Sequence, residues 1–207
     1  MQGDNMLTFL FFTSIASAAP KDYAFLSNRG LLYVKVLKDE TTAASGLSHN
    51  HAIQAVGWSG KASWDTENVE TCSVSLAVPV NSLYADRLEV RQKAGLSGSI
   101  SESQRKEITK NMLNKGQLWA DQHPMITFKS SSCTGGPEQA TIIGKFTLRG
   151  VTRDIRVPVT VDSSSGLKLT GSFKIKATDY GFKPYSAMFG QLRNQNEMSI
   201  HLELVSN

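Results

Sequence analysis

The sequence is poor in cysteine: Cys72 and Cys133 are the two in its 207 residues. They form no C-x-x-C pair and no histidine lies near them, so neither a redox motif nor a structural zinc site is indicated. In an oxidising compartment the two could form one disulfide. Alternatively, they are two small buried hydrophobic side chains that never meet.

The sequence also lacks an apolar run long enough to cross a membrane, which needs about 20 residues. The N-terminal run Leu7–Ile15 is shorter and is followed by Ala16-Ser17-Ala18, a pattern that signal peptidase cleaves. We therefore predict a signal peptide over residues 1–18 and a single exported domain over residues 19–207. The alternative is a buried N-terminal segment.

Strong charge of one sign is absent too. The net charge is +4, from 22 Lys and Arg against 18 Asp and Glu, and no long run of like charges occurs. This pattern predicts no nucleic-acid partner. Weak attraction to anionic lipid headgroups at a membrane surface remains open.

Motifs of catalysis are missing as well. The sequence contains no G-x-S-x-G, H-E-x-x-H, P-loop or G-x-G-x-x-G pattern, and Asp179 has no evident partner carboxylate. We therefore expect a protein that is not an enzyme and that carries no cofactor.

What the sequence has is alternation of apolar and polar residues, which is typical of half-buried strands. Strands are predicted at 31–38, 72–80, 125–133, 140–149, 151–161, 167–177 and 198–205. This pattern predicts an all-β protein, an antiparallel barrel or sandwich of about eight strands.

Residues 101–115 break the alternation and predict one helix between strands. Ile108, Met112 and Leu113 form its apolar stripe, and Glu102 and Lys106 pair on its outer face. A single helix in such a fold is expected to close one end of the barrel.

Each predicted strand has one apolar face, as a sheet closed on itself requires. A barrel of about eight strands is either filled by its own side chains or holds one ligand. The alternation does not distinguish these two cases.

Three segments resemble the YceI-like polyisoprenoid-binding proteins. Ala120–Ser132 is similar to a proline-led strand that runs into F-x-S, and Gly144–Ile155 to a G-x-L-T-x-x-G-V-T hairpin. Asp179-Tyr180-Gly181 resembles the short D-Y-G motif before the last strand of that family. Their order and spacing agree over Leu118–Val205.

This resemblance implies a lipocalin-like barrel in the periplasm that holds a long-chain lipid, as a monomer or homodimer, without catalytic residues. The apolar faces then supply the expected lipid-binding wall: Leu76, Val78, Phe128, Phe146, Leu148, Val157, Val159, Phe173, Ile175, Met198, Ile200 and Leu202. For each of these residues, ordinary core packing is the alternative role. Met188 and Phe189 are expected to cover the mouth of the barrel or to anchor a turn.

The sequence departs from the family pattern at three places. Phe146 replaces an aliphatic residue and could narrow the lumen, and Ala94–Ser101 is an insertion before the helix. An Arg-Asp-x-x-Leu element is only faintly echoed by Asp86-Arg87-Leu88. These differences affect the shape of one barrel end.

His49 and His51 point the same way on an extended chain. They could bond to backbone or water at a barrel rim, meet the polar headgroup of a lipid, or take part in metal binding or acid–base chemistry. Two histidines do not complete a zinc site, so no metal is expected. The functional alternatives are an accessory protein that presents a substrate to a membrane enzyme, and a small hydrolase or metal-binding protein.

Overall fold

The computed structural model describes residues 19–206, and the predicted signal peptide lies outside them. The strands are β1 (Lys21–Leu26), β2 (Leu31–Lys38), β3 (His51–Ala55), β4 (Ser59–Trp64), β5 (Ser73–Pro79), β6 (Leu83–Ala85), β7 (Met125–Gly135), β8 (Gln139–Leu148), β9 (Val151–Asp162), β10 (Lys168–Lys176), β11 (Ser186–Ala187) and β12 (Leu192–Val205). The helices are α1 (Leu88–Lys93) and α2 (Glu102–Leu113), with short 3-10 helices η1 (Ser45–Leu47), η2 (Val69–Thr71), η3 (Val80–Ser82), η4 (Ala177–Tyr180) and η5 (Met188–Gly190).

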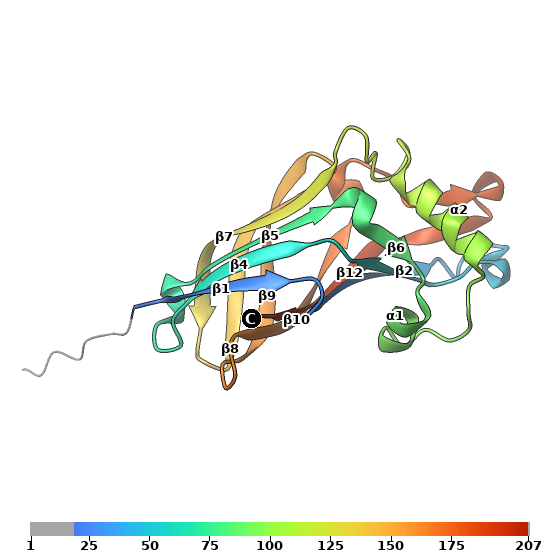
Figure 1. Ribbon diagram of the computed structural model, residues 1–207. Helices are drawn as coiled ribbons and strands as arrows, with labels where there is room; N and C mark the ends of the chain where they lie inside the picture. Colours follow the sequence, from blue (N-terminus) through green and yellow to red (C-terminus); the bar gives the residue numbers. More distant parts are fainter. Residues whose placement is uncertain (1–18, 207) are drawn as a thin grey trace, which may run out of the picture.

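The strands form one antiparallel 12-stranded sheet with the order β1-β4-β5-β7-β8-β9-β10-β12-β2-β3-β6, and β11 pairs with β12. The sheet curls around one apolar core (Figure 1). An antiparallel, lipocalin-like β fold is therefore confirmed, although the strand count exceeds the expected eight. The strands that the alternation did not predict are β1, β3, β4, β6 and β11.

The hairpin between β8 and β9 explains one of the sequence motifs. Leu148 pairs with Val151, and the two residues between them, Arg149 and Gly150, have φ angles of 51° and 74°. Two consecutive positive φ angles define a type I′ turn, which matches the twist of the flanking strands. The Arg-Gly pair therefore has a structural role in this turn.

Helix α2 begins at a capping box, in which Ser101 and Gln104 bond reciprocally to each other's backbone. Lys106 and Glu102 form the expected i,i+4 ion pair at 2.8 Å. Ile108, Met112 and Leu113 pack against the core, and α2 lies at one end of the sheet (Figure 1). The second helix, α1, was not expected; its Val90 packs outside the sheet against Ala52.

The opposite part of the barrel is filled by its own side chains. Phe25, Trp64 and Leu169 are buried there. An isolated antiparallel bridge between Phe25 and Ser206 brings β1 to the end of β12. These large apolar side chains therefore occupy the interior of the sheet at this end.

Cys72 and Cys133 form a disulfide, with their Cα atoms 5.9 Å apart. This settles the alternatives left open by the sequence. The bond links Cys72, which directly precedes β5, to Cys133 of β7, the neighbour of β5 in the sheet, and both cysteines are buried.

Replacing both cysteines, as in Cys72→Ser with Cys133→Ser, should lower the free energy of unfolding by about 4 kcal/mol. This figure follows from the loop-closure entropy of the 61-residue separation in the unfolded chain. Urea denaturation of the variant and of the oxidised wild type measures the difference, with the reduced wild type as a control. Equal midpoints for all three would contradict the prediction.

Candidate functional site

A cavity of about 470 Å³ lies inside the curled sheet, between its inner face and α2. Its volume falls within the range of small-molecule sites in proteins, about 300–1,000 Å³. Apolar side chains of β2, β3, β5, β7, β8, β9, β10 and β12 form its wall, and Ile108 and Met112 of α2 cover it. The cavity is therefore a hollow in the barrel core that α2 partly closes.

The structure places the predicted wall residues of six strands on this cavity: Leu76, Val78, Phe128, Phe146, Leu148, Val157, Val159, Phe173, Ile175, Met198, Ile200 and Leu202. Phe146 packs edge-on against Phe173 and Tyr180, at ring-centroid distances of 5.7 and 5.6 Å. Tyr180, from the D-Y-G segment, thus packs against a wall residue without lining the cavity itself.

Met188 and Phe189 differ from the prediction. Neither lines the cavity; Met188 is 51% exposed and Phe189 is fully exposed. Both belong to η5 and have positive φ angles, of 50° and 54°. This local backbone turns their side chains toward solvent beside the mouth, not across it.

Part of the cavity wall was not predicted from the sequence. Leu32, Val34 and Val36 of β2 line the cavity, as do Ile53 of β3 and Ile142 of β8. Because β2 is apolar along most of its length, its sequence does not show which of its faces is internal.

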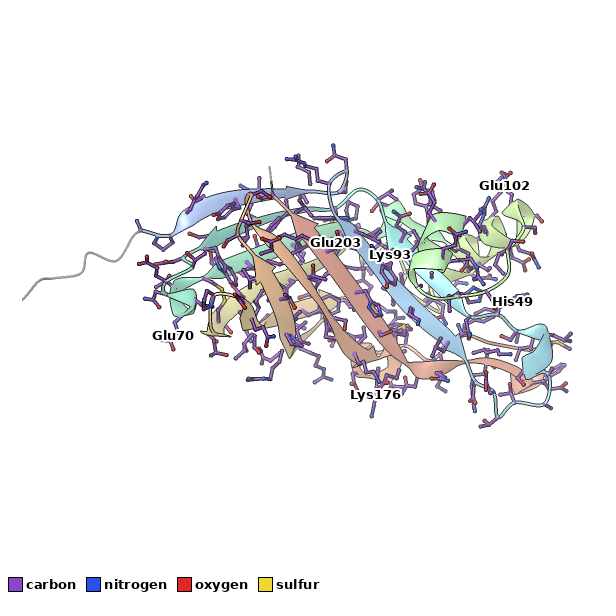
Figure 2. The ribbon with its side chains drawn as sticks, turned by 90° about the horizontal axis from the view of Figure 1, so that it is seen from below. His49, Glu70, Lys93, Glu102, Lys176 and Glu203 are labelled. Carbon is purple, nitrogen blue, oxygen red and sulfur yellow. A yellow bond between two sulfur atoms is a disulfide. The ribbon has the colours of Figure 1, made fainter. Side chains whose placement is uncertain are left out.

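Several polar lining residues come from the segments at one end of the cavity, near η1 and α2, and we call this end its mouth. Its lining residues include Ser48 and His49 after η1, Gln104 and Asn111 of α2, and Asn194 of β12. His49 is exposed and lies at the end of the molecule where the chain after β2 projects (Figure 2). A ligand inside would thus have an apolar surrounding along its length and polar groups at one end.

His51 also lines the cavity and is held by a buried carboxylate, a contact that was not predicted from the sequence. The Asp86 side chain is fully buried, and its Oδ2 lies 2.7 Å from His51 Nδ1. Its Oδ1 accepts hydrogen bonds from Ala52 N at 2.9 Å and from Arg91 Nη1 at 2.8 Å. Asp86 therefore holds His51 and Ala52, the first two residues of β3, in place.

Arg91, on α1, is almost as deeply buried, with 4% of its side chain exposed. Besides Asp86 it donates to the carbonyls of Asn50 at 2.7 Å, Ser97 at 2.6 Å and Gly98 at 3.1 Å. A buried charge is tolerated when it is paired and hydrogen-bonded in this way. Arg91 thereby joins α1, the start of β3 and the inserted segment before α2.

Two opposing effects act on the pKa of Asp86. Burial raises it, while hydrogen bonds and the nearby charges, first of all those of His51, lower it. The donors prevail, and the pKa of Asp86 lies below its ordinary value. The carboxylate is thus ionised at neutral pH.

Within residues 19–206, no three His, Cys, Asp or Glu side chains come together as a metal site would need. In the same range, no helix has the length and apolar character that crossing a membrane requires.

Comparison with known proteins identifies the family. The sequence profile of the YceI-like domain matches residues 36–205. The chain belongs to the YceI-like family. No curated protein sequence matches this YceI-like chain.

Two solved structures share the fold of this YceI-like chain. BcnA of Burkholderia cenocepacia is similar with a TM-score of 0.67 at 16% identity, over 88% of this chain and 99% of BcnA. A polyisoprenoid-binding domain from Saccharophagus degradans, implicated in plant cell wall breakdown, has a TM-score of 0.57 at 12% identity, over 89% of this chain and 97% of its own. At these identities the likeness concerns the fold.

Replacing Asp86 by Ala should destabilise the protein by about 3 kcal/mol at pH 7, because it leaves Arg91 as an uncompensated buried charge. The folded-state pKa of Asp86 is lowered, so the stability that the carboxylate contributes is present above about pH 4 and is lost as the pH falls through the folded-state pKa. Urea unfolding of wild type and Asp86→Ala between pH 7 and pH 2.5 measures this, and the gap between them should narrow toward acid. If the difference in free energy of unfolding between the two proteins grew toward acid pH, the direction given for the pKa shift of Asp86 would be wrong.

Proposed function

We propose that this chain binds a long apolar lipid, such as a polyisoprenoid, a quinone precursor or a fatty acyl or amide chain, inside its barrel. The observation that carries the proposal is the cavity itself, apolar in its wall and polar at its mouth. The polyisoprenoid-binding domain from Saccharophagus degradans, which shares the fold, supports the choice of ligand class. The predicted signal peptide supports action in the periplasm, as a carrier or store.

Burial of apolar tail surface can supply most of the binding free energy, so few directional contacts are needed. Burying about 300 Å² of tail surface, at roughly 25 cal/mol per Å², is favourable by about 7 kcal/mol before ordering costs. A dissociation constant of 1 μM corresponds to about 8 kcal/mol, so a tail that buries about 500 Å² reaches that affinity after an ordering cost of about 4 kcal/mol. The cavity wall is expected to act by excluding water, and the mouth residues by orienting the headgroup.

Binding without catalysis is part of the proposal. A nucleophile with a positioned base would be needed for hydrolysis, and among the residues described His51 bonds to Asp86 and to no hydroxyl group. We expect a bound lipid to be recovered chemically unchanged.

Phe173→Glu should reduce the affinity for a tail-labelled fluorescent isoprenoid at least 30-fold, because it places a carboxylate in the apolar wall. Ser172→Glu, its neighbour on the exposed face of β10, is the matched control and should bind like wild type. Circular dichroism checks that both variants are folded. Equal affinity in a folded Phe173→Glu protein would refute a lipid site in this cavity.

The surroundings of the mouth support membrane contact as the route by which lipid enters. Leu47 is 69% exposed on η1, and exposed Met188 and Phe189 lie on η5. A backbone hydrogen bond from Ala44 N to Gln191 O, at 3.1 Å, joins these two segments. Large apolar side chains exposed together in this way suit insertion into the headgroup region of a bilayer.

Combined Met188→Asp and Phe189→Asp substitution should slow lipid transfer from vesicles at least fivefold, while affinity for detergent-dispersed lipid stays unchanged. Neither residue lines the cavity, so the substitutions affect delivery and leave the site intact. Leu26→Asp is the control, because Leu26 is also exposed and lies outside the cavity lining. If the double variant transferred lipid from vesicles as fast as wild type, membrane contact through the mouth would be refuted.

A further inference from the structure

The fixed contact between His51 and Asp86 determines which hydrogen-bonding group His51 offers to the cavity. We infer that His51 accepts a hydrogen bond through Nε2, and that the bound lipid carries a donor headgroup such as an alcohol, a phenol or an amide N–H. This inference rests on the proposed lipid site. It excludes a bare carbonyl or ether oxygen as the group that His51 recognises.

The position of the proton on His51 follows from the hydrogen bonds that the other carboxylate oxygen of Asp86 accepts. Its Oδ1 accepts from two donors, Ala52 N and Arg91 Nη1, and an ionised carboxylate has no proton to give. At 2.7 Å, the contact between Oδ2 and His51 Nδ1 must therefore be a hydrogen bond that Nδ1–H donates. In a neutral imidazole the proton then sits on Nδ1, and Nε2 keeps its lone pair.

Arg91 Nη1 binds Asp86 Oδ1, so its positive charge offsets part of the negative charge of the carboxylate that His51 Nδ1 contacts. An imidazole is neutral well above its ordinary pKa of about 6.5, so ligand binding is compared at pH 8.

Nε2 is the atom free to meet a ligand. His51 lines the cavity with 14% of its side chain exposed, and Nε2 has no hydrogen-bond partner among residues 19–206. Nδ1, on the other side of the ring, is the atom committed to Asp86. The acceptor therefore remains for a group inside the cavity.

The contacts around Asp86 are fixed, and they therefore also fix which nitrogen of His51 carries the proton. Asp86 follows β6 with a φ angle of 54°, and its backbone N donates to Ala52 O at 2.8 Å while its side chain accepts from Ala52 N. Arg91 is fixed in turn by the carbonyls of Asn50, Ser97 and Gly98. A ligand-facing histidine oriented by a buried second partner cannot easily exchange its two nitrogens.

The test compares three ligands with the same 20-carbon isoprenoid tail: geranylgeraniol, its methyl ether and the corresponding aldehyde. Competition against a tail-labelled probe at pH 8 should give the alcohol about fivefold to tenfold tighter binding than either of the others, the range of one net hydrogen bond. His51→Phe keeps a ring of similar size without nitrogen and should bind all three equally. His201→Phe is the control, because His201 stacks on Tyr33, bonds to Ser199 and does not line the cavity, and this variant should keep the preference.

Asp86→Asn provides the decisive variant. Two donors face the Oδ1 position, so the amide oxygen should take it and the amide N–H₂ should face His51 Nδ1. Nδ1 then becomes the acceptor, Nε2 carries the proton, and the preference should reverse in favour of the aldehyde. A residue with a merely structural role would weaken all three ligands without a reversal.

The outcomes separate this inference from the proposed function. If all three ligands bind wild type equally well, the lipid site stands and the inference about His51 is overturned. If none binds, the proposed function itself fails. A folded Asp86→Asn protein that still prefers the alcohol contradicts the inference, and if that variant is unfolded, the comparison of wild type with His51→Phe decides.

Discussion

The structure depends on the apolar inner face of a curled antiparallel sheet that its own side chains fill at one end only. Near β1, Phe25, Trp64 and Leu169 pack the interior closed. Toward α2 the same face continues around a cavity of about 470 Å³. Because protein interiors otherwise pack to nearly crystalline density, an apolar hollow of this size is costly unless a ligand occupies it.

The buried polar cluster of His51, Asp86 and Arg91 connects the cavity wall to the segment that leads into α2. Asp86 and Arg91 hold the first residues of β3, and Arg91 also bonds to the carbonyls of Ser97 and Gly98 on the approach to α2. One buried ion pair thus orients His51 and fixes the inserted segment that positions the covering helix. The insertion and the altered Asp86 element, which are separate departures in the sequence, form a single structural unit.

Much of the fold could be predicted from the sequence because alternation is a local signal. It located β2, β5 and β7 to β10, while the family resemblance indicated the hairpin that turns at Arg149 and Gly150. The strands β3 (His51–Ala55) and β4 (Ser59–Trp64) escaped notice because they are short and rich in Ala, Gly and Ser. The first part of β12, Leu192–Glu197, is mostly polar and was missed for that reason.

The wall of the site could be predicted for the same reason, since alternation assigns each side chain to a face. The contact between His51 and Asp86 could not be predicted, because Asp86 follows β6 and is itself held by Arg91 of α1. Periodicity within one strand or helix does not indicate contacts between residues so far apart in the sequence. Nor could the sequence orient Met188 and Phe189. Their exposure follows from positive φ angles in a short turn, a feature that apolar composition conceals.

Native mass spectrometry of the protein purified without detergent, followed by organic extraction, tests the central claim most directly. The account predicts a mass increment of one apolar molecule per chain, which is lost on extraction and recovered unchanged in the organic phase. A folded protein that carries no such molecule, and that takes up none from isoprenoid-containing vesicles, would contradict it.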